Sequence, residues 1–183
     1  AGIDLGSTLT EIVASTSSLS SLLTVIQYID SNGSQADSAD LATLLGGTGP
    51  FTAFVPSNAA FDATLDLDGN GSFGSGDVSA LESQLGSAQA AADALYPVVA
   101  NHVTGSDEVL STELVDGLSI ETLAGSGSAY GLSVGVGSSV TITPSDPDFA
   151  ATVTAVDIQA INGVAHVIDT VLLDSATTSA LGL

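Results

Sequence analysis

The chain of 183 residues contains no lysine and no arginine. At ordinary usage a domain of this length carries roughly 20 of these residues. The 21 Asp and Glu residues are an ordinary number, so the net charge of -21 comes from missing cations rather than from added acids. Without basic side chains the chain cannot contact or be steered toward phosphates, which excludes nucleic acid and anionic membranes as partners. Divalent cations are its natural counter-charge.

Cysteine, methionine and tryptophan are also absent. Without cysteine there is no disulfide framework. Without methionine Ala1 is not a translated start, so either an initiator methionine or a signal peptide has been removed. Mean hydropathy is positive, at +0.47, yet no apolar run approaches the roughly 20 residues of a membrane-spanning helix. The apolar residues are spread at the spacing of secondary-structure elements, so we expect a soluble chain that does not insert into membranes.

The first third of the sequence has helical spacing. Thr8 and Glu11 fit a capping box, in which each side chain accepts a hydrogen bond from the other residue's backbone. Apolar residues from Leu19 to Ile29 then form a single helical stripe, which stops at the turn signal of Asn32-Gly33. Further helices are expected at Leu41–Leu45, from a Ser57 or Asn58 cap through Phe61, at Val78–Leu85 and at Ala88–Tyr96, where Pro97 should kink or restart the chain.

From Leu118 onward the apolar period changes to two, which is the period of β-strands. Including an earlier run, strands are expected at Phe51–Val55, Leu118–Leu123, Gly131–Val136, Val140–Thr143, Thr152–Ile158 and Val164–Leu172. Helices first and strands later favour an α+β domain with an antiparallel sheet. The length suits one domain with its own core. We therefore expect a single domain over residues 1–183, in which 175–183 form a loose tail.

Residues Asp66–Asp77, with the sequence DLDGNGSFGSGD, have the ligand spacing of a calcium loop. Gly71 stands at position 6, where a twelve-residue EF-hand-type loop needs a sharp turn, and Phe73 at the apolar position 8. Asp77 replaces the usual bidentate Glu, and its shorter reach should weaken binding, a substitution that resembles dockerin-type loops. The alternative is a solvated Asp/Gly turn. We expect calcium as the cofactor, bound at positions 1, 3, 5, 7 and 12 by Asp66, Asp68, Asn70, the Ser72 carbonyl and Asp77.

Two further segments are GPFTAFVPSNAAF at Gly49–Phe61 and NGVAHVID at Asn162–Asp169. In this order and separation they resemble the signature segments of the fasciclin-like domain, an extracellular adhesion module, and the resemblance covers roughly 8–174. It implies a wedge-like β-sheet with packed N-terminal helices, no catalytic activity, and a role in adhesion, matrix or biofilm. The calcium loop then lies in an insertion at about 62–86. The family often has Tyr-His where this chain has Asn101-His102, so the receptor binding linked to that pair is not carried over.

The two histidines, His102 and His166, raise the question of catalysis. A Ser-His-Asp hydrolase needs a nucleophile on a strained turn, and the sequence has no G-x-S-x-G segment. Two histidines without cysteine do not make up a zinc site. We expect both histidines to be structural and the chain not to be an enzyme. Of the two sequons, Asn32 lies in an exposed turn and could carry a glycan, whereas Asn70 is better used as a metal ligand. We expect both asparagines to be unmodified.

Together these patterns predict a secreted, calcium-stabilised adhesion or matrix protein, which reaches the extracellular space or cell surface after signal-peptide cleavage. Without basic side chains, copies must meet through apolar and hydrogen-bonding surfaces, and the apolar ends Ala1–Leu5 and Ala180–Leu183 are candidate contacts. We expect copies to assemble into polymers or filaments, with cell-surface protein or polysaccharide as a further partner. The alternative function is a module that binds surface polysaccharide or a small ligand, for which only 3 Tyr, 5 Phe and no Trp are available.

Overall fold

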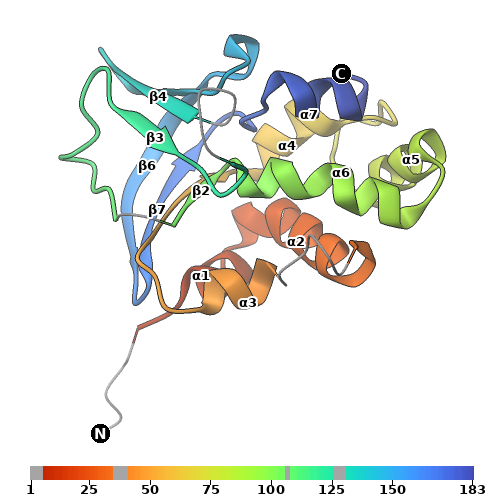
Figure 1. Cartoon of the computed structure of the whole chain (residues 1–183), viewed down its shortest axis with the longest axis horizontal. Helices are drawn as coiled ribbons and strands as arrows, with labels where there is room; N and C mark the ends of the chain where they lie inside the picture. Colours follow the sequence, from red (N-terminus) through yellow and green to blue (C-terminus); the bar gives the residue numbers. More distant parts are fainter. Residues whose placement is uncertain (1–5, 35–40, 106–107, 126–130) are drawn as a thin grey trace, which may run out of the picture.

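A computed structural model describes residues 6–34, 41–105, 108–125 and 131–183. The helices gather on one side of the molecule and the sheet lies on the other (Figure 1). The helices are α1 (Leu9–Ser15), α2 (Ser20–Asn32), α3 (Leu41–Gly46), α4 (Asn58–Leu65), α5 (Ser75–Leu85), α6 (Ala88–Ala100) and α7 (Ser175–Leu181). The strands are β1 (Phe51–Pro56), β2 (Val103–Thr104), β3 (Ser119–Glu121), β4 (Gly131–Val136), β5 (Val140–Thr143), β6 (Ala151–Ala160) and β7 (Gly163–Ile168). The predicted α+β class is confirmed.

The strands form one strongly curved sheet in the order β2-β1-β7-β6-β5-β4-β3. Among the described strands every neighbouring pair is antiparallel except β1 and β7, which run parallel with Phe51 opposite Gly163 and Pro56 opposite Ile168. The sequence predicts an antiparallel sheet and does not reveal this parallel pair. Strands β1 and β7 are joined by most of the chain, and a parallel pair requires such a long crossover.

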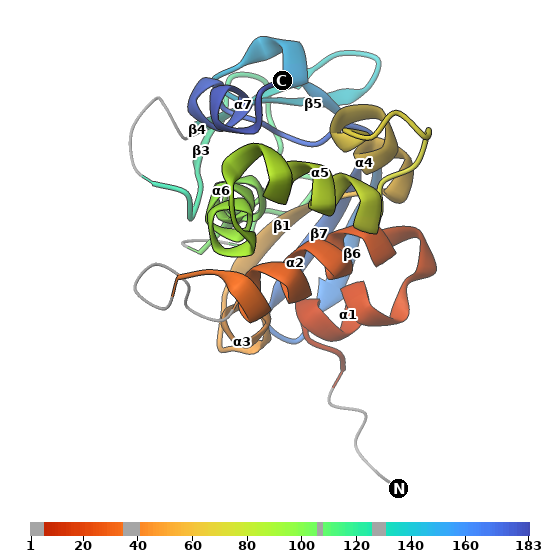
Figure 2. The same ribbon diagram turned by 90° about the vertical axis from the view of Figure 1, so that its right-hand side faces the viewer.

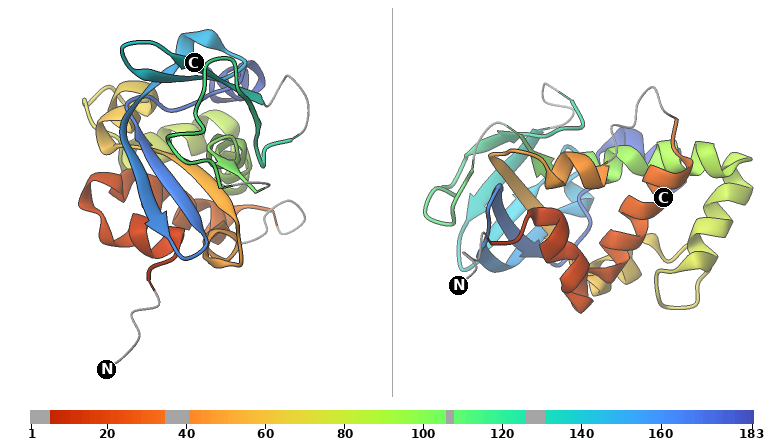
Figure 3. Two further views of the ribbon diagram at one scale, coloured as in Figure 1. Left: turned by 90° about the vertical axis from the view of Figure 1, so that its left-hand side faces the viewer. Right: turned by 90° about the horizontal axis from the view of Figure 1, so that it is seen from below.

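Strand β1 is the centre of the molecule, and all six of its residues are buried. This explains its continuous apolar sequence, which is typical of a strand covered on both faces. Phe51, Ala53 and Val55 belong to the core under the helices. Phe54 points to a second core, which it shares with Ile142 of β5 and with residues of the neighbouring strands. The two faces of the sheet are therefore packed differently, one by helices and one by the sheet curling over itself (Figure 3).

The helical core is built from the apolar stripes of α1, α2 and α6, which pack against β1 and β7 (Figure 2). Each stripe repeats at three or four residues, as an amphipathic helix requires. The most deeply buried members of this core include Leu9, Val25, Ile26, Phe61, Leu65 and Leu95. Full burial of each such side chain contributes on the order of 2 kcal/mol of hydrophobic free energy.

The predicted helix caps are present. The Thr8 hydroxyl accepts from the Glu11 N–H at 3.3 Å, and the Glu11 carboxylate accepts from the Thr8 N–H at 2.8 Å. At α4 the cap is Ser57, which accepts from the Ala60 N–H at 3.3 Å. The neighbouring Asn58 instead accepts from the Ser21 N–H at 3.0 Å and so ties α4 to α2. The structure therefore decides between the two cap candidates.

Two local expectations differ from the structure. Helix α6 is continuous through Pro97 to Ala100, so the chain does not restart there, although Pro97 has no N–H to donate to the carbonyl four residues earlier. Residues 175–183 are not a loose tail, since Asp174 caps helix α7 and Leu181 is only 1% exposed. Of the two apolar ends proposed as contacts, Ala180–Leu183 thus belongs largely to this packed helix, while Ala1–Leu5 lies outside the described residues.

Within the described ranges, no single helix is both long and apolar enough to cross a bilayer. Only the pair Leu9–Ser15 and Ser17–Asn32, taken together despite a bend of 102°, passes a test of length and composition. Both members of this pair contribute to the helical core described above.

Candidate metal centre

The predicted calcium loop connects the end of α4 to the first turn of α5. Asp66 is half-buried, Asp68 is exposed and Asp77 is fully buried. One carboxylate oxygen from each of these three residues lies within 4.8 Å of the other two. The structure therefore brings together three residues that the spacing placed at positions 1, 3 and 12.

Backbone N–H groups orient the exposed carboxylates. The N–H of Asn70 lies 3.0 Å from an oxygen of Asp66 and 3.0 Å from an oxygen of Asp68. The second oxygen of Asp66 accepts from the Gly71 N–H at 2.9 Å, and that of Asp68 accepts from the Asn70 side-chain amide at 2.7 Å. A carboxylate has about four lone-pair sites, so each of these two keeps about two for a further ligand.

Asp77 is more heavily used by the protein itself. Its Oδ1 accepts from the N–H groups of Leu67 at 2.6 Å and Asp68 at 3.0 Å, and its Oδ2 accepts from the Gly74 N–H at 2.7 Å. These bonds cap the start of α5 and close the loop. They leave about one lone-pair site on the carboxylate, enough for one metal–oxygen bond. Asp77 in this geometry is therefore a monodentate ligand at most.

The remaining predicted ligands, Asn70 and Ser72, lie in the exposed part of the loop. The side-chain oxygen of Asn70 accepts from the Ser72 N–H at 3.0 Å and from the Ser72 hydroxyl at 2.8 Å. Both lone pairs of this oxygen are therefore engaged. For Asn70 to bind a metal through it, the bond from the freely rotating Ser72 hydroxyl has to open.

Glycines give the loop its shape at two positions. Gly71 has φ of 88°, a left-handed conformation that residues with a side chain rarely adopt. At Gly76 the constraint is space, since a Cβ atom would lie 1.9 Å from the Oδ2 atom of Asp68. The Asp68 carboxylate thus lies directly over the first turn of α5. Gly76 was not among the predicted site residues. A glycine directly before Asp77 could have indicated that a side chain packs closely against the backbone there.

The loop is anchored to the core through Phe73. The Phe73 N–H donates to the Asp62 carboxylate of α4 at 2.8 Å. Its ring contacts that of Phe61 with 5.3 Å between centroids, and Phe61 is completely buried. Phe73, at the apolar position 8, therefore connects the loop to the helical core. The role of Asp62 was also not predicted, because a hydrogen bond between residues eleven positions apart leaves no periodic pattern in the sequence.

Helix α5, which leaves the loop, is attached to two other helices. The Tyr28 hydroxyl of α2 lies 2.7 Å from the Glu82 carboxylate and 3.1 Å from the Ala88 carbonyl. Burial, followed by the bond to Glu82, raises the pKa of Tyr28 above its ordinary value. The Gln84 side chain donates to the Leu181 carbonyl of α7 at 3.3 Å. Helix α5 is thus packed on the other helices rather than projecting from them.

Both histidines are buried and bonded to the backbone. His102 donates from Nδ1 to the Val98 carbonyl at 2.6 Å and accepts at Nε2 from the Leu172 N–H at 2.8 Å. His166 donates from Nε2 to the Val109 carbonyl at 2.9 Å and accepts at Nδ1 from the Asp157 N–H at 3.3 Å. A carbonyl on one nitrogen and an N–H on the other fix a neutral tautomer in each ring. Burial lowers the pKa of His102 to about 4. Neither ring nitrogen of either residue is left for catalysis.

His166 also helps to hold the segment that connects β2 to β3. This segment bonds to β6 through Ser111, which donates its N–H at 2.8 Å and its hydroxyl to the Asp157 carboxylate. These two bonds hold the pKa of the Asp157 carboxyl below its ordinary value. Asp157 itself has φ of 56° at an irregularity of strand β6. The Ser-His-Asp residues meet here as a structural clamp, in which the serine bonds to the aspartate rather than to the histidine.

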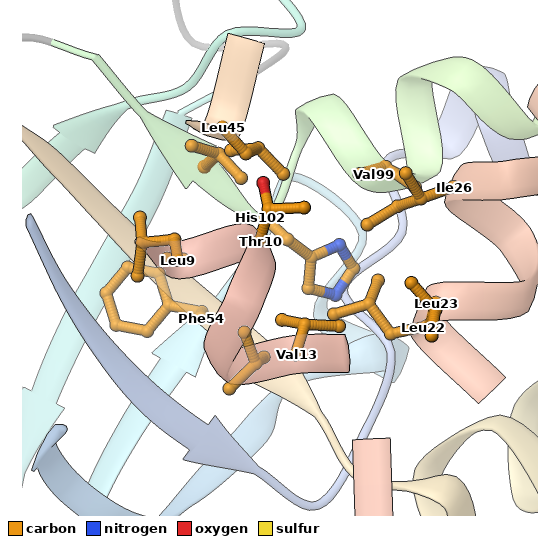
Figure 4. Close-up of a pocket in the computed structure, with 13 residues that line it drawn as sticks. Leu9, Thr10, Val13, Leu22, Leu23, Ile26, Leu45, Phe54, Val99 and His102 are labelled. Atoms are coloured by element: carbon orange, nitrogen blue, oxygen red, sulfur yellow. The ribbon is translucent and has the colours of Figure 1, made fainter. Parts of the chain in front are cut away.

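A small closed cavity lies between α1, α2 and β1 (Figure 4). Its volume is about 20 Å³, and it is lined by Leu9, Val13, Leu22, Phe54 and the ring of His102, among others. This volume has room for little more than one water molecule, and a cavity with such apolar walls stays dry. It is a packing defect, too small for a ligand.

A larger open groove, of about 500 Å³, lies at the end of the molecule where β6 turns into β7. Its walls are the 46–50 turn before β1, the 160–163 hairpin tip, Thr8 and Glu108. Asn162 holds these walls together: it accepts from the Leu9 N–H at 3.0 Å and donates to the carbonyls of Leu45 at 2.7 Å and Gly47 at 2.8 Å. None of the described residues that line this groove is aromatic.

Comparison with known proteins relates this geometry to a family. The sequence pattern of the Fasciclin domain matches residues 18–174. The structure of a FAS1 domain pair from the insect cell adhesion molecule Fasciclin I matches with a TM-score of 0.64 and 19% sequence identity over 93% of this chain. The chain spans about half, 52%, of that protein chain. At this identity the likeness shows a shared fold. No curated protein matches the sequence.

Proposed function

The chain belongs to the fasciclin family, and on that premise we propose that it is an extracellular adhesion or matrix protein that binds calcium and assembles with copies of itself. Domains of this family are adhesion and structural modules rather than enzymes, typically of extracellular or cell-surface proteins. The calcium and the assembly are the specific parts of the proposal, and each has its own support.

The convergence of Asp66, Asp68 and Asp77 supports calcium binding. Calcium binds oxygen at about 2.3–2.6 Å, so two oxygens on one ion lie at most about 5 Å apart. The three carboxylate oxygens lie within 4.8 Å of one another and satisfy this limit. All the donors are oxygens in an irregular loop, which suits calcium better than magnesium with its strict octahedral geometry. The Ser72 carbonyl, Asn70 and water would complete the six to eight ligands.

Calcium would act by stiffening the loop. At about 4.8 Å each pair of carboxylates repels by about 1 kcal/mol even in water, and by more where Asp77 is buried. A divalent ion removes this repulsion and holds both ends of the loop together. Through Phe73 and Glu82 the ordered loop would stabilise α5 against α4 and α2. With Asp77 limited to one bond, we expect a dissociation constant of about 10⁻⁴ to 10⁻³ M, the range of extracellular modules.

Thermal unfolding with and without calcium tests the binding. At a calcium concentration one hundred times the dissociation constant, the free energy of unfolding should rise by about 2.7 kcal/mol. By calorimetry, Asp68→Ala should lose calcium binding, whereas Asp148→Ala, a matched exposed aspartate outside the loop, should keep it. Equal losses in the two variants would mean that calcium acts through general electrostatics. A melting temperature that is unchanged by chelator, in protein shown to be metal-free, would contradict the calcium site.

The charge of the chain supports assembly that depends on ions. With a net charge of -21 and no lysine or arginine, copies repel one another at low ionic strength and cannot form conventional salt bridges. Salt at about 1 M shortens the range of this repulsion to about 3 Å, whereas bound calcium lowers the net negative charge itself. We propose that copies then associate through uncharged surface into polymers or filaments. The mass in solution, measured over a concentration series at millimolar calcium, tests this directly, and a strict monomer at every concentration would refute self-assembly.

The alternative, a module that binds surface polysaccharide or a small ligand, would use the groove beside Asn162. Its walls among the described residues are glycines, a proline, two aliphatic side chains, two threonines, Asn162 and one carboxylate. Sugar rings are usually bound by stacking on exposed aromatic side chains, and this groove offers none among those residues. The adhesion and assembly proposal is therefore better supported.

A further inference from the structure

The groove of about 500 Å³ has features of a docking surface. Its volume falls in the range of about 300–1,000 Å³ that accommodates ligands the size of a short peptide. Ile161, on its rim, is 59% exposed, the highest value among the large apolar side chains described. Glu108 is its one charged lining residue among those described. Because only one carboxylate lines it among the described residues, this surface would repel a second negatively charged copy only weakly.

The chain enters the described structure at the rim of this same groove. The Ser7 carbonyl accepts a hydrogen bond from the Ile161 N–H at 3.0 Å. Gly6 packs so closely on Ile161 that a Cβ atom at Gly6 would lie 2.5 Å from its Cγ2. The five residues that precede Gly6 are Ala1-Gly-Ile-Asp-Leu5, in which Ala1, Ile3 and Leu5 alternate with Gly2 and Asp4. This period of two is the pattern of a short strand with one apolar face.

We propose that segment 1–5 of one copy docks in the groove of a second copy. If it turned back into its own groove, a tight reversal would use about two residues, which leaves Leu5 out of the groove. A segment from a facing copy can present all three apolar residues. Five extended residues span only about 17 Å, so the second copy has to lie close to Ile161.

The exchange should be reciprocal. Gly6, at which segment 1–5 joins the described chain, lies at the rim of the groove, so the copy that receives a segment can also give one. Such an arrangement has two-fold symmetry and closes as a dimer. It would cover both copies of Ile161. It would also bring Asp4 near Glu108, which is a further reason for association to require salt or calcium. The inference rests on the proposed self-assembly and defines its smallest unit.

The absence of native cysteine allows a direct test. Leu5→Cys and Thr48→Cys are made in separate full-length chains, Thr48 being an exposed residue of the groove wall. The two chains are mixed at millimolar calcium and oxidised mildly. Linked peptides are identified by mass spectrometry after digestion at acidic residues, since trypsin has no site to cut. Ser83→Cys, an exposed position on α5, replaces Thr48→Cys in the control mixture.

We expect the 5–48 link to form at least tenfold more than the 5–83 link. We also expect Ile161→Asp to remain monomeric with a near-native melting temperature, while the unmodified chain forms dimers. Equal amounts of the 5–48 and 5–83 links, in protein whose mass in solution still rises with calcium, would show that the groove is not the contact. Self-assembly itself would then still stand. A chain that carries both Leu5→Cys and Thr48→Cys tests the remaining possibility. If the 5–48 link forms only within one chain, the segment occupies its own groove and the exchange is overturned. If the unmodified chain stays monomeric, self-assembly and groove exchange both fail.

Discussion

The hydroxyl of Tyr28 on α2 lies 2.7 Å from the carboxylate of Glu82 on α5, across 54 positions of sequence. This bond connects the N-terminal helices to the helix that follows the metal loop. Burial raises the pKa of Tyr28, and the bond to Glu82 raises it further, because the tyrosine must keep its proton to donate. Helix α5 is therefore bonded to the N-terminal part of the domain.

Replacing Tyr28 with Phe should lower the free energy of unfolding by about 1 kcal/mol, since it removes a hydrogen bond to a charged group. For a domain of this size the melting temperature should fall by about 3 °C. Tyr96→Phe is the matched control, because the Tyr96 hydroxyl makes no hydrogen bond to the described residues. Calorimetric scans of the two variants make the comparison. If they melt together, the Tyr28–Glu82 bond contributes nothing to stability.

Gly76→Ala should disrupt the metal centre, because the new methyl group would occupy the position of the Asp68 carboxylate. We expect calcium affinity to fall at least tenfold as Asp68 is pushed out of the cluster. Gly74→Ala is the control: Gly74 has an extended backbone with φ of -165°, and a Cβ atom there meets nothing within 4 Å. Titration calorimetry with calcium measures both variants. Comparable affinity in the two would mean that Asp68 is not a ligand.

His102 should make the domain less stable in mild acid. Its pKa is about 4 in the folded protein, against an ordinary value of 6.5. Between these values the unfolded chain binds a proton that the folded chain does not, so the free energy of unfolding falls as pH decreases from 6.5 to about 4. This contribution is fully present above pH 6.5 and amounts to about 3 kcal/mol at most.

The pH effect is measured by urea unfolding at several values between pH 7.5 and 4.5. His102→Gln cannot titrate, so its stability should depend less on pH than that of the unmodified chain. The carboxylates contribute equally to both profiles and cancel in the difference. Parallel profiles would show that His102 does not control acid stability.

Asn162 joins three parts of the fold through buried hydrogen bonds, so its loss should be costly. Asn162→Ala removes the bonds to Leu9, Leu45 and Gly47, and should destabilise the domain by about 3 kcal/mol. Asn162→Asp should be at least as harmful, since a carboxylate oxygen would then face two carbonyl oxygens. Asn32→Ala, which loses a single bond to the Tyr28 carbonyl, is the control. Chemical unfolding should show that both Asn162 variants are less stable than Asn32→Ala. Equal stabilities of the three variants would contradict the role of Asn162.

Features that depend on neighbouring residues could be predicted from the sequence. The cap of α1 at Thr8 and strand β5 at Val140–Thr143 were both expected and are both present. The carboxylates of Asp66, Asp68 and Asp77 lie close together in the structure, and their binding of calcium stays a prediction. A capping box, a strand period and a metal loop each span at most about a dozen residues, so local chemistry specifies them.

Features that depend on distant residues could not be predicted in this way. The sequence alone determined the family resemblance, the absence of conventional salt bridges and the candidate ligands of the loop. Only the tertiary structure decided that β1 pairs in parallel with β7, that 175–181 packs as a helix, and that Gly76 lies under Asp68. It also decided that three backbone N–H groups leave Asp77 one bond for a metal. The β1–β7 pairing joins distant segments of the chain, and the contacts inside the loop depend on the direction in which each side chain points; neither leaves a period in the sequence.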